Sequence, residues 1–180
     1  MTKVSINLMR QIYIQYYDSP CGTLILGGMA EKLCLCDWAA NSHRERNDAR
    51  LQRMFNATYV IRQSDVVEQA ISELEEYFRG ARTTFDIPLL MAGTEFQKQV
   101  WQSLLSIPYG TTVSYGEEAR RLGKPLAVRA VASANAANAV SIIVPCHRVI
   151  GSDGSLMGYA GGAAAKQWLL QLEQSRNRIE

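Results

Sequence analysis

The residues of this sequence best suited to chemistry are a thiol and an imidazole side by side, Cys146 and His147. A histidine base can take the proton from a thiol, and the resulting thiolate is a strong nucleophile. The apolar run 140–144 predicts a buried strand that ends at Pro145 and delivers both side chains to a turn. Burial disfavours a thiolate, so a base or a positive charge must lie close by. The alternative is an inert core cysteine, but the polar neighbours His147 and Arg148 favour a nucleophile.

Length and composition are those of an ordinary globular protein, with 180 residues, 47% hydrophobic content and a net charge of +2. No apolar run approaches the roughly 20 residues that cross a bilayer, and no signal peptide is visible. We therefore expect a cytoplasmic protein without membrane contact, whose four cysteines are free thiols. Cys21, Cys34, Cys36 and His43 match no zinc-finger spacing, so we expect neither a metal nor a cofactor.

Alternation and turn residues predict a small antiparallel sheet at the start of the chain. Its strands are expected at 11–17, 23–28 and 32–38. A polar helix should follow over 44–55. A further helix, which Ser64 and Asp65 can cap, carries apolar residues at helical spacing until Gly80 and should cover the sheet. Residues 83–93 are the best candidate linker, so the sequence predicts an amino-terminal domain over 1–92.

Three short helices are predicted in a second domain, residues 93–180, and their spacing is typical of a helix-turn-helix. They are expected from Thr94 to Ile107, from Ser114 to Leu122 and from Leu126 to about Ala137. The third helix consists almost wholly of small residues and Arg129, so it can lie close against a phosphate-lined groove. Residues 110–150 carry five basic and two acidic groups, a net +3. This positive balance suits contact with DNA.

The second half of the chain resembles the O6-alkylguanine-DNA alkyltransferases, also called methylated-DNA-protein-cysteine methyltransferases. The resemblance covers Thr94 to Glu173. Its motifs, in order, are Gly93-Thr94-Glu95-Phe96-Gln97, Val113-Ser114-Tyr115-Gly116, Ala127-Val128-Arg129-Ala130-Val131, Pro145-Cys146-His147-Arg148-Val149 and Gly158-Tyr159-Ala160-Gly161-Gly162. It implies an α/β (α+β) fold: a small amino-terminal β-sheet domain with a covering helix, then a mostly helical carboxy-terminal domain with the helix-turn-helix and the active-site cysteine.

Proteins of this family bind double-stranded DNA through the minor groove, flip the damaged base out of the stack and take its alkyl group irreversibly onto the cysteine. The resemblance therefore implies single-use repair of O6-alkylguanine, and also of O4-alkylthymine, without a cofactor or an obligate protein partner. Cys146 would be the nucleophile and His147 the base, acting through a water. The resemblance gives Glu173 the role of orienting His147, while Asp153 is the rival carboxylate nearer in sequence.

The resemblance also assigns the remaining site residues. The Tyr115 hydroxyl would assist the departing guanine, and Asn138 would bridge the helix-turn-helix to the cysteine segment. Arg129 would fill the space of the flipped base, although it can also be read as a solvated charge. The DNA-binding residues implied are Arg129, Ser114, Tyr115, Ala127, Ala130 and Lys124. The alkyl and base pocket implied consists of Pro145, Val149, Met157, Tyr159, Ala160 and Gly161.

Three positions depart from the family pattern. Ala139 stands where many relatives have proline, and Ala160 stands where some have serine. Glu118 occupies a position that is commonly apolar, so its charge is expected to reach solvent or to pair with Arg120 or Arg121. Two other functions remain open at this point: a non-catalytic helix-turn-helix protein that recognises alkylated DNA, and a cysteine hydrolase with multiple turnover.

Overall fold

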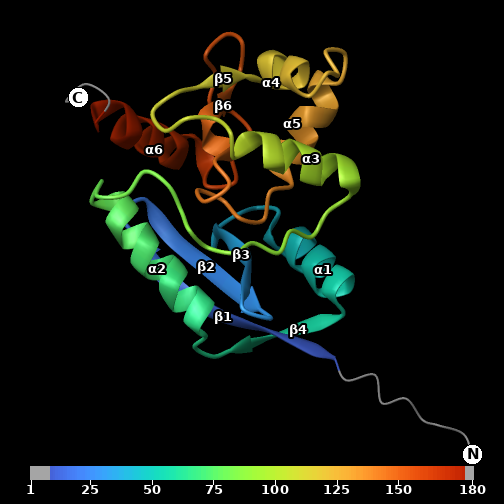
Figure 1. The fold of residues 1–180 in the computed structure, drawn as a ribbon, viewed down its shortest axis with the longest axis vertical. Helices are drawn as coiled ribbons and strands as arrows, with labels where there is room; N and C mark the ends of the chain where they lie inside the picture. Colours follow the sequence, from blue (N-terminus) through green and yellow to red (C-terminus); the bar gives the residue numbers. More distant parts are fainter. Residues whose placement is uncertain (1–8, 177–180) are drawn as a thin grey trace, which may run out of the picture.

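A computed structural model describes residues 9–176, and the amino-terminal half of the chain forms a four-stranded sheet in the order β3-β2-β1-β4 (Figure 1). The strands are β1 (Arg10–Ser19), β2 (Gly22–Met29), β3 (Lys32–Trp38) and β4 (Ala57–Ile61). The first three pair antiparallel, at the places that the sequence predicts. The sequence analysis did not predict β4, which pairs parallel with β1. No local turn signal marks such a pairing, since a parallel neighbour arrives through a long connection.

Helices cover both faces of this sheet. The predicted polar helix is α1 (Arg44–Phe55), and the predicted covering helix is α2 (Asp65–Phe78). On α2 the buried residues Val67, Ala70 and Leu74 face the core that the sheet shares with the second half of the chain. Leu51 of α1 packs in a separate apolar cluster on the other face. Ser64 stands at the start of α2, but its hydroxyl makes no capping hydrogen bond.

The carboxy-terminal half is mostly helical, as expected. Its elements are α3 (Glu95–Leu104), β5 (Val113–Ser114), α4 (Tyr115–Arg121), α5 (Val128–Ala136), η1 (Cys146–Arg148), β6 (Val149–Ile150) and α6 (Gly162–Arg176). Thr94 and Ser114 both close capping boxes, which fix where α3 and α4 begin. Helices α4 and α5 form the helix-turn-helix, with Gly123 at φ +68° in the turn between them. Helix α5 begins at Val128, two residues later than predicted.

The segment before Cys146 is a chain of tight turns, so the prediction of a strand over 140–144 is wrong. The Ile143 N–H donates to the Ser141 carbonyl at 2.9 Å, which places Ile142 at φ +72° in the centre of a three-residue turn. The Cys146 N–H donates to the Val144 carbonyl at 2.8 Å across Pro145. An apolar run predicts burial correctly but does not separate a strand from other buried backbone.

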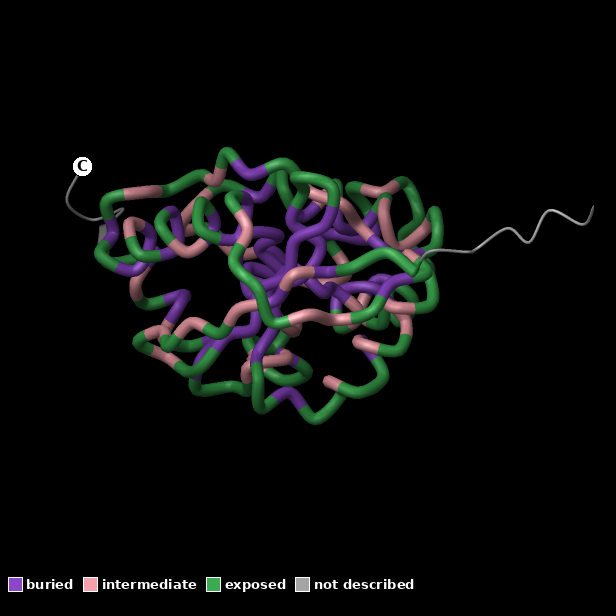
Figure 2. The backbone as a smooth tube through the Cα atoms, turned by 90° about the horizontal axis from the view of Figure 1, so that it is seen from below, coloured by how far each residue is buried: buried purple, intermediate pink, exposed green. Residues whose placement is uncertain are grey.

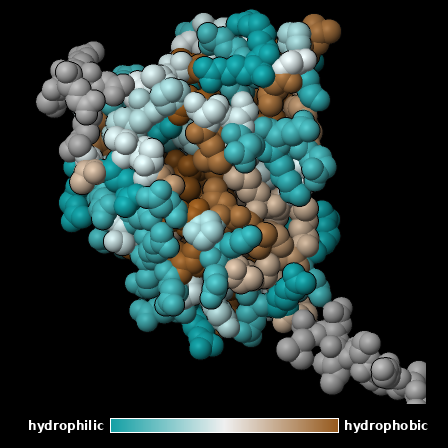
Figure 3. Space-filling view, in the orientation of Figure 1, coloured by the Kyte–Doolittle hydropathy of each residue, from teal (hydrophilic) through white to brown (hydrophobic). Residues whose placement is uncertain are grey.

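A continuous core joins the two halves of the chain. One buried cluster contains residues of β2, β3 and α2 together with residues of α3, α5, η1 and α6. Buried backbone accordingly runs through the middle of the molecule in Figure 2. In Figure 3 the apolar surface gathers near the centre of the view, where the connection between α2 and α3 crosses, and hydrophilic side chains surround it. None of the helices within residues 9–176 is long and apolar enough to cross a membrane.

Candidate active site

Cys146 opens the short helix η1 directly after the turn at Pro145, and its side chain is only 3% exposed. Burial raises the pKa of this thiol to about 11, while the Asn138 amide and the Lys166 ammonium offset part of the rise. At neutral pH Cys146 is therefore a protonated thiol. A base has to remove that proton before the sulfur can attack.

Glu173 of α6 is the centre of the polar network behind Cys146. Its Oε1 accepts a hydrogen bond from the Tyr77 hydroxyl at 2.7 Å and lies 2.7 Å from His147 Nε2. Its Oε2 accepts from Arg148 Nε at 2.9 Å and from the Gly110 N–H at 3.0 Å. The side chains of this network are buried, with Glu173 and His147 fully excluded from solvent. The fold therefore brings Glu173, rather than Asp153, to His147.

The charge state of this network leaves His147 neutral, so that it can act as a base. Burial by itself raises the pKa of Glu173, but the hydrogen bond from His147 and the charge of Arg148 outweigh it and hold the pKa well below its usual range. Because the ionised carboxylate only accepts, we assign the imidazole proton to Nε2. Burial also lowers the pKa of His147, against the opposing pull of Glu173, so the ring is neutral at pH 7. Nδ1 then carries the lone pair, and it has no hydrogen-bond partner among the described residues.

Asp153 lies away from this network. Its Oδ1 accepts from the Ser155 N–H at 3.0 Å, and the side chain is exposed on the turn after β6. That hydrogen bond and a second one from the Ser155 side chain lower the pKa of Asp153. Asp153 therefore organises its own turn.

Two asparagines fasten α5 to the cysteine segment. Asn138 donates to the Val144 carbonyl at 3.0 Å and accepts from the Val140 N–H at 2.9 Å. Asn135, which the sequence analysis did not single out, donates to the Cys146 carbonyl at 3.4 Å. Any shift of α5 would therefore reach the backbone that carries the thiol. The available signal was the three-residue spacing of Asn135, near the end of a helix of small residues, and Asn138, just after that helix.

Two further groups near Cys146 shape its electrostatics. Tyr115 is half-buried, and burial and the neighbouring Cys146 raise the pKa of its hydroxyl. Lys166 of α6 is 1% exposed and donates to the Val149 carbonyl at 2.6 Å. The sequence analysis missed Lys166 because nothing local marks a lysine that will be buried.

The residues expected to form the alkyl pocket lie in two groups. Pro145, Val149 and Tyr159 are buried with Cys146, whereas Met157 is 74% exposed. Tyr159, Ala160 and Gly161 line a cavity of about 340 Å³ that also reaches Cys21 and Trp38. A Cβ on Gly161 would lie 2.4 Å from the Trp38 ring, so the loop rests directly on the amino-terminal half of the chain.

The residues expected to contact DNA lie along the helix-turn-helix. Arg129 and Ala130 are exposed on α5, and Ala127 is half-buried at its start. Ser114 accepts from the Glu117 N–H at 3.1 Å as the cap of α4. Lys124 lies 5.5 Å from the centre of the Phe96 ring. Beside them, Leu126 is 99% exposed in the turn between the helices.

The expectation that Glu118 reaches solvent or forms an ion pair is wrong. Glu118 neither reaches solvent nor pairs with Arg120 or Arg121: its side chain is 0% exposed, and both carboxylate oxygens are without a hydrogen-bond partner among the described residues. The capping box at Ser114 fixes the register of α4, and this register points position 118 inward together with Ala119.

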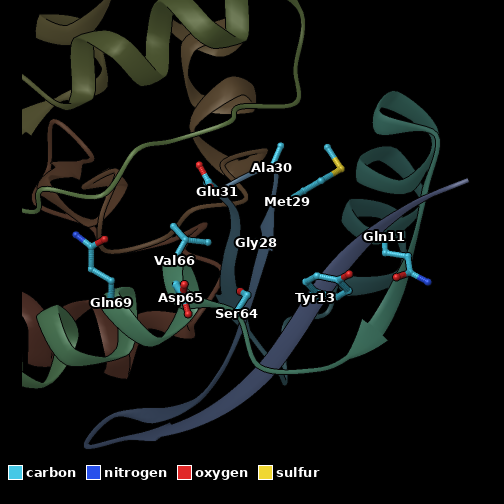
Figure 4. A pocket seen from close by; sticks show the side chains of 10 residues that line it. All are labelled: Gln11, Tyr13, Gly28, Met29, Ala30, Glu31, Ser64, Asp65, Val66 and Gln69. Carbon is cyan, nitrogen blue, oxygen red and sulfur yellow. The ribbon is translucent and has the colours of Figure 1, made fainter.

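A larger cavity of about 450 Å³ lies in the amino-terminal half (Figure 4). Strand β1, the turn between β2 and β3, and the start of α2 surround it. Its lining includes Tyr13, Glu31 and Asp65 but neither a thiol nor an imidazole. Within residues 9–176, no group of His, Cys, Asp and Glu is placed to hold a metal ion.

The fold and the site together define a class: a helix-turn-helix protein with a buried thiol beside a carboxylate-bound histidine. Two family models match the chain, the 6-O-methylguanine DNA methyltransferase ribonuclease-like domain over residues 12–91 and the DNA binding domain of the same family over residues 95–175. The chain belongs to the 6-O-methylguanine DNA methyltransferase family.

Similar proteins agree with this family. The methylated-DNA–protein-cysteine methyltransferase of Mycobacterium leprae is 44% identical over 163 residues, which span 91% of this chain and 93% of the relative. A crystal structure of Mycobacterium tuberculosis OGT in complex with DNA superposes with a TM-score of 0.77 at 42% identity, covering 91% of this chain and 94% of that one. The methyltransferase of the archaeon Pyrococcus kodakaraensis shares the fold, with a TM-score of 0.70 at 21% identity over 90% of this chain and 98% of that one.

Proposed function

We propose that this protein repairs DNA by transferring an alkyl group from O6 of guanine to the sulfur of Cys146, once per molecule. The observation that carries the proposal is the 2.7 Å contact between His147 Nε2 and Glu173 next to a buried thiol. The family and the DNA complex of a relative at 42% identity support DNA as the partner. O4-alkylthymine is a second substrate of the same reaction type.

The reaction is a displacement at carbon. His147 Nδ1 takes the thiol proton through a water, and the carboxylate of Glu173 stabilises the imidazolium that forms. The thiolate of Cys146 then forms a bond to the alkyl carbon while the bond from that carbon to O6 breaks. Guanine leaves with the electron pair and regains a proton from the site, so the products are a thioether and ordinary guanine.

The Tyr115 hydroxyl assists the departing base, because it can hydrogen-bond the negative charge that grows on guanine. The electrostatic effect of Cys146 on the pKa of the Tyr115 hydroxyl supports this role. A thioether is chemically stable, and no cofactor takes part in the reaction. The protein is therefore consumed by one alkyl group.

DNA handling belongs to α4 and α5. The small residues of α5 let the helix approach the minor groove, and Arg129 fills the stack when the alkylated base rotates towards Cys146. The division into domains at 92/93 is part of this proposal, supported by the two family matches that end at 91 and begin at 95. We also propose that the protein acts in the cytoplasm and needs no obligate protein partner.

Intact-protein mass spectrometry after mixing with duplex DNA that contains O6-methylguanine tests the proposal. We expect a gain of one methyl group, mapped by peptide analysis to Cys146, and no further product. Cys146→Ser should bind the duplex without gaining mass. Methyl on Cys21, Cys34 or Cys36, or more repaired DNA than protein, would contradict the proposal. Absence of labelling with intact DNA binding would favour the non-catalytic alternative.

A further inference from the structure

A basic cleft of about 430 Å³ lies between α1 and the end of α5. Its lining includes His43, Arg46, Arg50 and Arg53 on one side and Ser133 and Ala136 of α5 on the other. No carboxylate is among the described residues that line it. Figure 1 shows the arrangement, with α1 below the ends of α3 and α5. The cleft therefore concentrates positive charge directly beside the helix-turn-helix.

Arg50 is the fixed member of this cluster. Its Nη2 donates to the Ala137 carbonyl at 2.5 Å, which ties α1 to the end of α5. Its Nε is buried and has no hydrogen-bond partner among the described residues. Burial lowers the pKa of Arg50, and repulsion by Arg46 lowers it further. An anion in the cleft would counter both effects, because its negative charge stabilises the guanidinium. It could also accept a hydrogen bond from the unpaired Nε–H.

Arg46 and Arg53 are the exposed members, and neither forms an ion pair with a described residue. The nearby Arg44 differs, since it is held by Asp48 at 2.6 Å. Two arginines that form no ion pair within residues 9–176, one helical turn on either side of a fixed third, are a suitable arrangement for groups with several oxygen acceptors.

The cleft continues the exposed face of α5. Arg129, Ser133 and Ala136 are exposed at spacings of four and three residues, so they lie on one side of the helix. The seven residue steps from Arg129 to Ala136 span about 10 Å at 1.5 Å per step. At 3.4 Å per base along one strand, this is about three base steps. A duplex placed on Arg129 therefore has backbone within reach of α1.

We propose that the cleft formed by Arg46, Arg50 and Arg53 binds phosphate groups of the DNA backbone. These phosphates would lie about three base steps from the flipped base whose place Arg129 takes. The inference rests on the proposed DNA binding and extends it to the amino-terminal half of the chain. The chemistry of the ligand is that of a phosphodiester, and free phosphate is the competing source of the same group.

The double variant Arg46→Ala, Arg53→Ala tests the proposal, with Arg62→Ala as the matched control. Arg62 is an exposed arginine just after β4, 5.1 Å from the Tyr13 ring, and lines no part of the cleft. Affinity for an unmodified duplex is measured at several salt concentrations. We expect binding about tenfold weaker at 0.15 M salt and a log–log salt slope reduced by about 2, one for each lost phosphate contact. Arg62→Ala should match the wild type.

Other outcomes separate the alternatives. An unchanged salt slope in the double variant would overturn the proposal, as would an equal loss in Arg62→Ala. If inorganic phosphate at constant ionic strength raises the Tm of the wild type but not of the double variant while the DNA slope is unchanged, the cleft binds free phosphate instead. The reaction with a free alkylated guanine base should be the same in all three proteins. If no alkylated substrate labels the wild type, the proposed function fails, and the salt slopes still decide the cleft.

Discussion

At the scale of single residues, Glu173 does two things at once. It receives hydrogen bonds from Tyr77 and Arg148, which makes it structural, and it binds the imidazole nitrogen opposite the one that would take the thiol proton. These roles can be tested separately, because removal of the Tyr77 hydroxyl takes away one donor to Oε1 and leaves the carboxylate beside His147.

Changing Glu173→Gln should slow alkyl transfer to a free guanine base about tenfold or more, because an amide does not stabilise the imidazolium that forms. It should also lower the stability of the folded state by about 2 to 4 kcal/mol, since Arg148 loses its buried counter-charge. Transfer rates against pH and urea unfolding measure the two effects.

Two controls accompany this variant. Tyr77→Phe removes one donor to the same carboxylate, so it should lower stability without slowing transfer to the same degree. Asp153→Asn should change neither, because that side chain is exposed on its own turn. Equal transfer rates for wild type and Glu173→Gln would end the assignment of Glu173.

Glu118→Leu should stabilise the protein by about 1 to 3 kcal/mol, because it removes a buried carboxylate that lacks hydrogen-bond partners and supplies apolar contact. Urea unfolding measures the gain. Glu75→Leu on α2 is the control, since that side chain is exposed and should gain little. A loss of stability in Glu118→Leu would mean that the carboxylate has a function in the folded state.

At the scale of elements, α5 links the DNA surface to the thiol through Asn135 and Asn138. In the proposed mechanism Arg129, on the exposed face of α5, is needed only where a base must leave a duplex. Arg129→Ala should therefore react nearly normally with a free alkylated base and about ten- to a hundredfold more slowly on duplex DNA, a loss of about 1 to 3 kcal/mol.

Salt dependence distinguishes this role from simple phosphate attraction. Screening weakens charge attraction but not the filling of a vacated stack, so the defect of Arg129→Ala should persist at raised salt. Arg121→Ala, an exposed arginine on α4, serves as the comparison. A defect that disappears with salt, or an equal loss on the free base, would refute the stacking role.

How far the sequence predicts the structure differs among the elements. Local signals located the helices with capping boxes at Thr94 and Ser114, and alternation located the first three strands. Contacts between distant segments were not visible: the parallel pairing of β4 with β1, the turns before Cys146, and the buried positions of Glu118 and Lys166. Glu173 was found only through the resemblance, because it lies 26 positions after His147 and nothing in the intervening sequence indicates their contact.

At the scale of the whole molecule, the network around Glu173 joins α2, η1 and α6, so its charge state should influence global stability. The folded-state pKa of Glu173 lies below its ordinary value, so its contribution is complete above about pH 4.5 and is lost as the pH falls further. Unfolding from pH 7 to pH 3 should show the stability difference between wild type and Glu173→Gln shrinking on acidification. A difference independent of pH would contradict this assignment.

The order of the residues around this carboxylate has a consequence for protein synthesis. Tyr77, Gly110 and His147 are all made before Glu173, which then joins them in the folded protein. A nascent chain therefore already contains the helix-turn-helix and the thiol while the histidine still lacks its carboxylate. In genetic terms, a stop codon or frameshift anywhere upstream of codon 173 should abolish repair, even one that leaves every DNA-contacting residue encoded.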